Sequence, residues 1–164
     1  MKKVGAASLS DHPGVVQLPS NVRRYMDRSV AYLKDADELL KVSLVSERVY
    51  TKAAELCDLA DREAQQVFRF STGDQVRLNV KNHIDKVRQV KNAILKQKAD
   101  FTTHIRSLVA EHQIKTGMTV RDVAFSWGPP LMQNRDGQSE KWVYQDNNGY
   151  QKELIFRDGI LIGY

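Results

Sequence analysis

The chain has 164 residues, 41% of them hydrophobic and 27% charged, with a formal net charge of +5, as is ordinary for one or two soluble globular domains. No run approaches the roughly 18 apolar residues of a membrane-spanning helix, which excludes such a helix from the sequence. The single cysteine excludes an internal disulfide framework and a cysteine metal site. Cys57 lies in a helical pattern, where we expect a small core residue rather than a reactive thiol.

Residues 1–18 contain glycine and proline without an apolar period, and we interpret them as a mobile leader. Residues 1–3 have the basic character of the start of a secretory signal. The apolar run at 4–9, however, is shorter than the usual signal core of about 7–15 residues. The sequence is compatible with a cytoplasmic protein whose native start is Met1, or with an exported one whose signal has been removed.

Residues 19–115 are predicted to form a long antiparallel helical hairpin. Gly73 is the only glycine in this region and no proline interrupts it after its first residue, so we expect the turn at 71–74. A β-branched and serine-rich run at 43–46 is a candidate break in the first arm. The arms could pair within one chain or between two copies, so a homo-oligomer through the helices remains open.

The second arm combines an apolar seam with an excess of positive charge. Residues 75–115 contain nine lysines and arginines and three acidic residues, a net charge of +6. A basic helix can bind nucleic acid or an anionic surface, but a solvated helix face is the simpler interpretation. No aromatic residues interleave the basic ones, so we do not expect nucleic acid as the partner. The candidate polyanion contacts in this alternative are Lys81, Lys86, Arg88 and Lys96. The seam, with spacings of three and four, consists of Val80, Ile84, Val87, Lys91, Ile94, Lys98, Phe101, Ile105, Leu108 and His112.

Residues 116–164 are predicted to form a small α+β module that begins with one short helix. Thr119 is a good N-cap, and Asp122 three residues later completes a capping box. Gly128 can take the left-handed conformation that ends a helix, and a proline follows it. One helix face is apolar, with spacings of three and four, at Val120, Val123, Ala124 and Trp127.

After the helix the period changes to two, which predicts a three-stranded antiparallel meander at 141–145, 152–157 and 160–164, with 131–133 as a candidate for a further short edge strand. Asp158-Gly159 is a strong signal for a tight hairpin turn. This turn places Phe156 opposite Leu161 and Ile155 opposite Ile162. One face then carries Leu154, Phe156 and Leu161, and the other carries Ile155, Ile160, Ile162 and Tyr164.

The second of these faces is the candidate protein-interaction surface, because contiguous apolar surface on a soluble protein often marks a partner site. The alternative is that the helical hairpin covers it. No pattern of nucleophile, phosphate-binding loop or metal ligands is present, so we expect no enzyme activity, no cofactor, no metal and no small-molecule substrate. The histidines of the second arm are interpreted as surface or seam residues.

The module resembles the SmpA/OmlA domain, the BamE-like fold of the bacterial envelope. The resemblance is carried by Gly117-Met118-Thr119, Val123, Gly128-Pro129, Trp142-Val143-Tyr144, Leu154-Ile155-Phe156 and Gly159-Ile160-Leu161. It implies a non-enzymatic scaffold that supports outer-membrane protein assembly as a component of an envelope complex, with other proteins as partners. It also implies a location in the periplasm or at the inner face of the outer membrane, if an export signal has been removed. The alternative remains a cytoplasmic nucleic-acid or anionic-surface binding protein that uses the basic helix 75–115.

Overall fold

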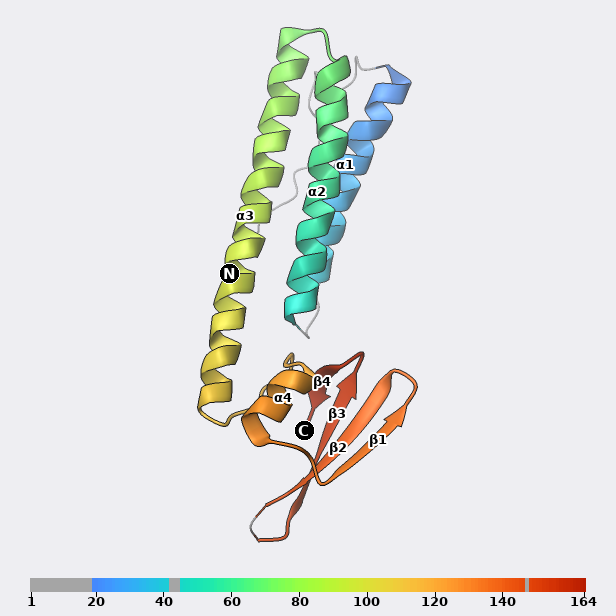
Figure 1. The fold of residues 1–164 in the computed structure, drawn as a ribbon. Helices are drawn as coiled ribbons and strands as arrows, with labels where there is room; N and C mark the ends of the chain where they lie inside the picture. The colour runs from blue at the N-terminus through green and yellow to red at the C-terminus, as the bar shows by residue number, and fades with distance from the viewer. Residues whose placement is uncertain (1–18, 42–44, 147) are drawn as a thin grey trace. The chain divides into compact units, whose positions relative to one another are not determined.

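The computed structural model describes residues 19–41, 45–146 and 148–164, so the leader expected at 1–18 lies outside the described residues. The described chain has a long helical part followed by a short helix and an antiparallel sheet, which confirms the predicted α+β class (Figure 1). The helices are α1 (Ser20–Leu40), α2 (Glu47–Phe70), α3 (Asp74–Ala110) and α4 (Val120–Trp127). The strands are β1 (Met132–Asp136), β2 (Ser139–Gln145), β3 (Gln151–Arg157) and β4 (Ile160–Gly163).

The chain divides into two compact units, and the division falls inside α3, between Lys96 and Gln97. Among the described residues, the helical unit contains 19–41 and 49–96, and the α+β unit contains 45–48 and the chain from 97 onward. The sequence placed the module's start at residue 116. The difference arises because the last turns of α3, including Ile105, pack in the core of the α+β unit.

The helical unit packs α1, α2 and the first part of α3 around small side chains of α2. Ala53, Cys57, Ala60 and Ala64 are completely buried, so neighbouring helices can approach α2 closely. Cys57 is therefore the small core residue that its sequence position predicts. Between α1 and α2 the candidate break at 43–46 falls partly on residues 42–44, which lie outside the described part of the chain. In the described part of the region, the first arm consists of two helices, α1 and α2, whose facing ends lie on either side of the candidate break.

A buried polar link joins the three helices at Ser29 of α1. The Ser29 hydroxyl donates to the backbone oxygen of Ala60 in α2 at 2.7 Å. Because that bond uses its only proton, the 2.8 Å contact with Nε2 of His83 in α3 requires the imidazole to donate. His83 is therefore held as one neutral tautomer, and burial lowers its pKa to about 4.

The short helix α4 begins and ends as its sequence indicates. The Thr119 side chain accepts a hydrogen bond from the Asp122 backbone N–H, and the Asp122 carboxylate accepts from the Thr119 N–H, so the predicted capping box is confirmed. Gly128 ends the helix with φ 79° and ψ −169°. This is an extended conformation with positive φ rather than the expected left-handed helical one, and it is almost restricted to glycine.

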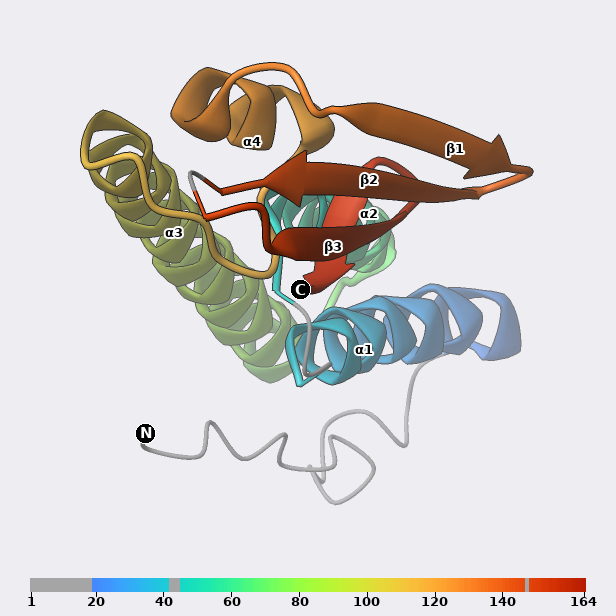
Figure 2. The same ribbon diagram turned by 90° about the horizontal axis from the view of Figure 1, so that it is seen from below.

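The antiparallel sheet has the order β1-β2-β3-β4, one strand more than the predicted meander. β1 contains part of the candidate edge segment 131–133 and continues to Asp136, where Gly137 at φ 57° turns the chain into β2. The strands lie side by side with β1 at the outer edge (Figure 2). All five side chains of β1 are exposed, so its sequence has no alternation of apolar and polar residues that would predict the whole strand.

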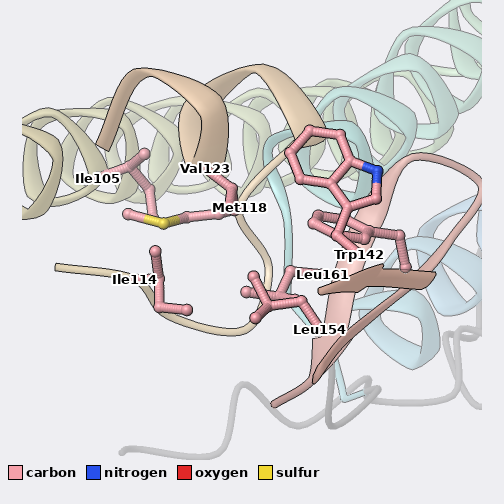
Figure 3. Close-up of a cluster of buried hydrophobic side chains, with 8 residues drawn as sticks. Ile105, Ile114, Met118, Val123, Trp142, Leu154 and Leu161 are labelled. Atoms are coloured by element: carbon pink, nitrogen blue, oxygen red, sulfur yellow. The ribbon is translucent and has the colours of Figure 1, made fainter. Parts of the chain in front are cut away.

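The core of the α+β unit forms between one face of the sheet, α4 and the end of α3. Met118 is completely buried, and Figure 3 shows its side chain between Ile105, Ile114 and Val123. Gly117, just before it, has φ 94°, and a β-carbon there would lie 2.4 Å from the Val45 backbone oxygen. A glycine is therefore required where these two segments meet. The sheet contributes Trp142, Leu154, Phe156 and Leu161 to this core.

Candidate interaction surface

The two faces of β3 differ sharply in exposure. Leu154 and Phe156 are completely buried against the core, whereas Ile155 between them is 46% exposed. Phe156 pairs with Leu161 across the hairpin, as predicted, and Leu161 is also completely buried. Asp158 and Gly159 both have positive φ, which is the tight primed turn that the sequence predicts. The predicted core face of the hairpin is thus confirmed.

The opposite face of the hairpin is not assembled as the sequence predicts, because β4 contains a β-bulge. Ile155 pairs with Gly163 rather than with Ile162, so one extra residue interrupts the alternation of β4. Tyr164 consequently leaves the face of Ile155. Its hydroxyl donates to the Ile114 backbone oxygen at 3.2 Å, and the Lys152 ammonium lies 4.8 Å from the centre of its ring.

The remaining predicted contacts, Ile160 and Ile162, are half-buried on β4. The segment before α4 pairs with the outer edge of this strand. The Leu161 N–H donates to the Met118 oxygen at 2.8 Å, and the Gly117 N–H donates to the Leu161 oxygen at 2.9 Å. The edge of β4 is therefore occupied within the chain. Ile160 and Ile162 lie on the strand that pairs with the segment before α4, and Tyr164 contacts Ile114 and Lys152. Of the four predicted interaction residues, Ile155 is therefore the one that we keep as part of a candidate surface.

A neighbouring apolar surface that the sequence did not single out lies on β1 and β2. Met132 is 62% exposed and pairs directly with half-buried Val143. Val143 is the diagonal neighbour of Ile155, because it pairs with Glu153 two residues earlier in β3. Met132, Val143 and Ile155 therefore share the sheet face opposite the core, and we call these three residues the open-face patch.

An ion pair crosses the open-face patch, and a free edge borders it. Lys141 and Glu153 lie on the same sheet face and pair at 2.6 Å along the diagonal between Val143 and Ile155. Leu131, 59% exposed, precedes β1, whose outer edge pairs with no other strand in the described chain. Apolar side chains beside charged ones occur in protein-binding surfaces, and an unpaired edge can accept an extended segment.

On the other side of the sheet, Tyr144 belongs to an aromatic cluster. The Tyr144 ring packs edge-on against Trp127, with 5.3 Å between the ring centres, and the Tyr144 hydroxyl donates to the Gly128 oxygen at 2.8 Å. Burial raises the pKa of Tyr144 to about 12, so it stays neutral at physiological pH. The Trp127 indole N–H donates to the His112 oxygen at 2.8 Å. These contacts tie α4 and the residue after it to β2 within the α+β unit.

Acidic side chains of α2 neutralise part of the positive charge of the predicted basic helix 75–115, whose lysines and arginines within α3 we call the basic stripe of α3. Arg88 pairs with Asp61 at 3.1 Å, and Lys91 pairs with Asp58 at 2.5 Å. The other polyanion candidates, Lys81, Lys86 and Lys96, form no ion pair with any residue in the described ranges. Arg88 thus differs from the other three candidates because its charge is already paired with a carboxylate of α2.

The seam of α3 ends earlier than the sequence predicts. His112 lies beyond the last residue of the helix with φ 56°, and its Nδ1 contacts the Ser126 backbone oxygen at 2.8 Å. Lys98, a charged residue within the predicted seam, pairs with Glu47 at 3.2 Å. No cluster of three or more metal-ligating side chains occurs among the residues that the structure covers. None of the described helices is long and apolar enough to span a membrane.

Comparisons with protein-family models, with curated proteins and with solved structures found no match to this chain.

Proposed function

We propose that the chain is a non-enzymatic interaction protein of the bacterial cell envelope, which binds another protein through the sheet of its α+β unit. The envelope assignment rests on the resemblance of the module's motifs to the BamE-like domain. The proposed role is that of an accessory component in an envelope protein complex. The location is the periplasm or the inner face of the outer membrane, if the native protein carries an export signal.

The observation that carries this proposal is the open-face patch beside the free edge of β1. Ile155 alternates with two completely buried neighbours, so its exposure is a property of the fold rather than of a loose strand. Covering the exposed parts of Met132 and Ile155 with a partner would remove apolar surface from water, worth about 25 cal/mol for each square ångström. A partner strand on β1 would add main-chain hydrogen bonds.

The alternative function, a cytoplasmic nucleic-acid or anionic-surface binder that uses the α3 stripe, has weaker support. Arg88, Lys91 and Lys98 are each engaged by an acidic side chain. A polyanion would have to compete with these carboxylates for the middle of the stripe. Binding through the stripe would also fall steeply with salt, because phosphate contacts release counterions.

The test is co-purification of the native complex from the source cells with two matched charge variants. Met132→Asp changes the open-face patch, whereas Phe125→Asp changes an equally exposed apolar residue of α4. We expect Met132→Asp to lose its partner and Phe125→Asp to retain it, with both proteins folded. Equal retention by both variants would refute the surface assignment. Recovery of the native protein solely in the cytosolic fraction would refute the envelope assignment.

A further inference from the structure

The end of the helical unit where α2 turns into α3 exposes two large apolar side chains. Phe70, the last residue of α2, is 58% exposed, and Leu78, early in α3, is 52% exposed. Residues 71–73 connect the two helices, so both side chains flank one short turn. Neither belongs to a hydrophobic cluster of the described chain. We call this end of the helical unit the hairpin tip.

The start of α1 lies at the same end. Val22 of α1 packs in one cluster with Val67 of α2 and Val80 of α3, and Figure 1 shows the beginning of α1 beside the α2–α3 turn. Exposed cations therefore gather at the tip from all three helices. They are Arg23, Arg24, Arg69, Arg77 and Lys81, and the exposed acidic residues there are Asp27 and Asp74.

These cations are available to an external anion. No ion pair joins any of the five to another described residue. The Arg77 guanidinium lies 4.8 Å from the centre of the Phe68 ring, so its stem runs along apolar surface while its charge stays at the tip. Five cations against two carboxylates leave the tip with a net charge of +3.

We infer that the hairpin tip docks on an anionic lipid surface, with its cations at the headgroups and Phe70 and Leu78 entering the boundary of the acyl chains. Interfacial binding uses both parts of this surface, because apolar burial and attraction to anionic lipids add to each other. A nucleic acid would engage the cations and could stack on Phe70, but it would leave Leu78 without a partner. The hairpin tip belongs to the helical unit and the open-face patch to the α+β unit, so the two surfaces share no residue.

The experiment is co-sedimentation of the full chain with vesicles, either of phosphatidylcholine alone or of equimolar phosphatidylcholine and phosphatidylserine. We expect binding to the anionic vesicles only, weakening as salt rises. The double variant Arg69→Gln/Arg77→Gln should lower the affinity by more than about tenfold, since each cation near the surface is worth about fivefold. Phe70→Ser/Leu78→Ser should lower it by a similar factor through lost apolar burial.

The matched control is Leu95→Ser/Lys96→Gln, which changes an exposed apolar residue and an exposed cation on the same helix. These residues lie about 25 Å beyond Leu78 at 1.5 Å per residue. We expect the control to bind anionic vesicles as the unchanged protein does. Equal weakening by the control and the tip variants would overturn the inference, because the whole basic helix would then be the contact. So would the absence of binding to anionic vesicles at low salt, or binding of single-stranded RNA in place of vesicles.

Discussion

Lowering the pH from neutral should destabilise the helical unit through His83. The imidazole is buried and donates to Ser29, so the folded state favours its neutral form and its pKa falls to about 4. In the unfolded chain the histidine has its ordinary pKa of about 6.5. The unfolded state therefore binds the proton more tightly, and stability is lost as pH falls from about 6.5 to about 4.

The magnitude follows from the two pKa values. They differ by about 2.5, and each pH unit corresponds to 1.36 kcal/mol, so the loss reaches about 3 kcal/mol at the acid end. That is a large part of the stability of a small domain. Above about pH 6.5 the contribution of His83 is complete and does not change further.

The assay is denaturant unfolding followed by the helical circular dichroism signal across this pH range. His83→Gln serves as the comparison, because glutamine can donate to the Ser29 hydroxyl but does not titrate. The unchanged protein should lose about 3 kcal/mol more than the variant between pH 6.5 and pH 4. Carboxylates titrate in both proteins and cancel in the difference. Parallel pH profiles would refute the assignment of a buried neutral imidazole.

Three further pairs of substitutions test the α+β unit. Leu154→Asp should unfold the unit, because the new charge would be buried without a partner. Ile155→Asp, on the exposed face, should leave the near-ultraviolet tryptophan signal intact. Loss of this signal in both variants would contradict the assignment of the two faces. Trp127→Ala should cost about 3 kcal/mol in denaturant melts and Trp127→Phe about 1–2, and a change under 1 for the alanine would mean that the ring is not packed. Gly117→Ala should cost about 2–4 kcal/mol, because both its positive φ and a backbone oxygen 2.4 Å from the new β-carbon oppose it. Gly149→Ala, which has positive φ but no such close contact, should cost clearly less; equal costs would show that Val45 has moved away.

The parts of the fold that sequence predicted well are those set by local chemistry. The capping box of α4 depends on two residues three positions apart, and both of its hydrogen bonds form. The alternation of Leu154, Ile155 and Phe156 follows from the period of a strand with one buried face. The turn at Asp158-Gly159 requires positive φ at two successive residues, which this dipeptide favours.

The parts that sequence missed depend on contacts between distant segments. The α3 seam shows which residues are apolar, but not that Val87 would pack against helices and Ile105 beside a sheet. The bulge in β4 follows a correct turn, so the turn signal could not reveal that Tyr164 changes face. Met132 was missed as a surface residue because β1 is exposed throughout and carries no period. Because of the β4 bulge and the exposed β1, the candidate surface consists of Met132, Val143 and Ile155 instead of Ile155 with the three residues of the last predicted strand.

Photo-crosslinking in intact source cells can show whether a partner protein covers the open-face patch. A photoreactive amino acid would replace Met132 on the open-face patch or, as the matched control, Phe125 on α4, since both positions are strongly exposed. We expect an adduct from position 132 with one envelope protein, and none of that adduct from position 125. No adduct from position 132, the same adduct from both positions, or an adduct with cytoplasmic proteins would contradict the claim that this sheet face binds a partner in the cell envelope.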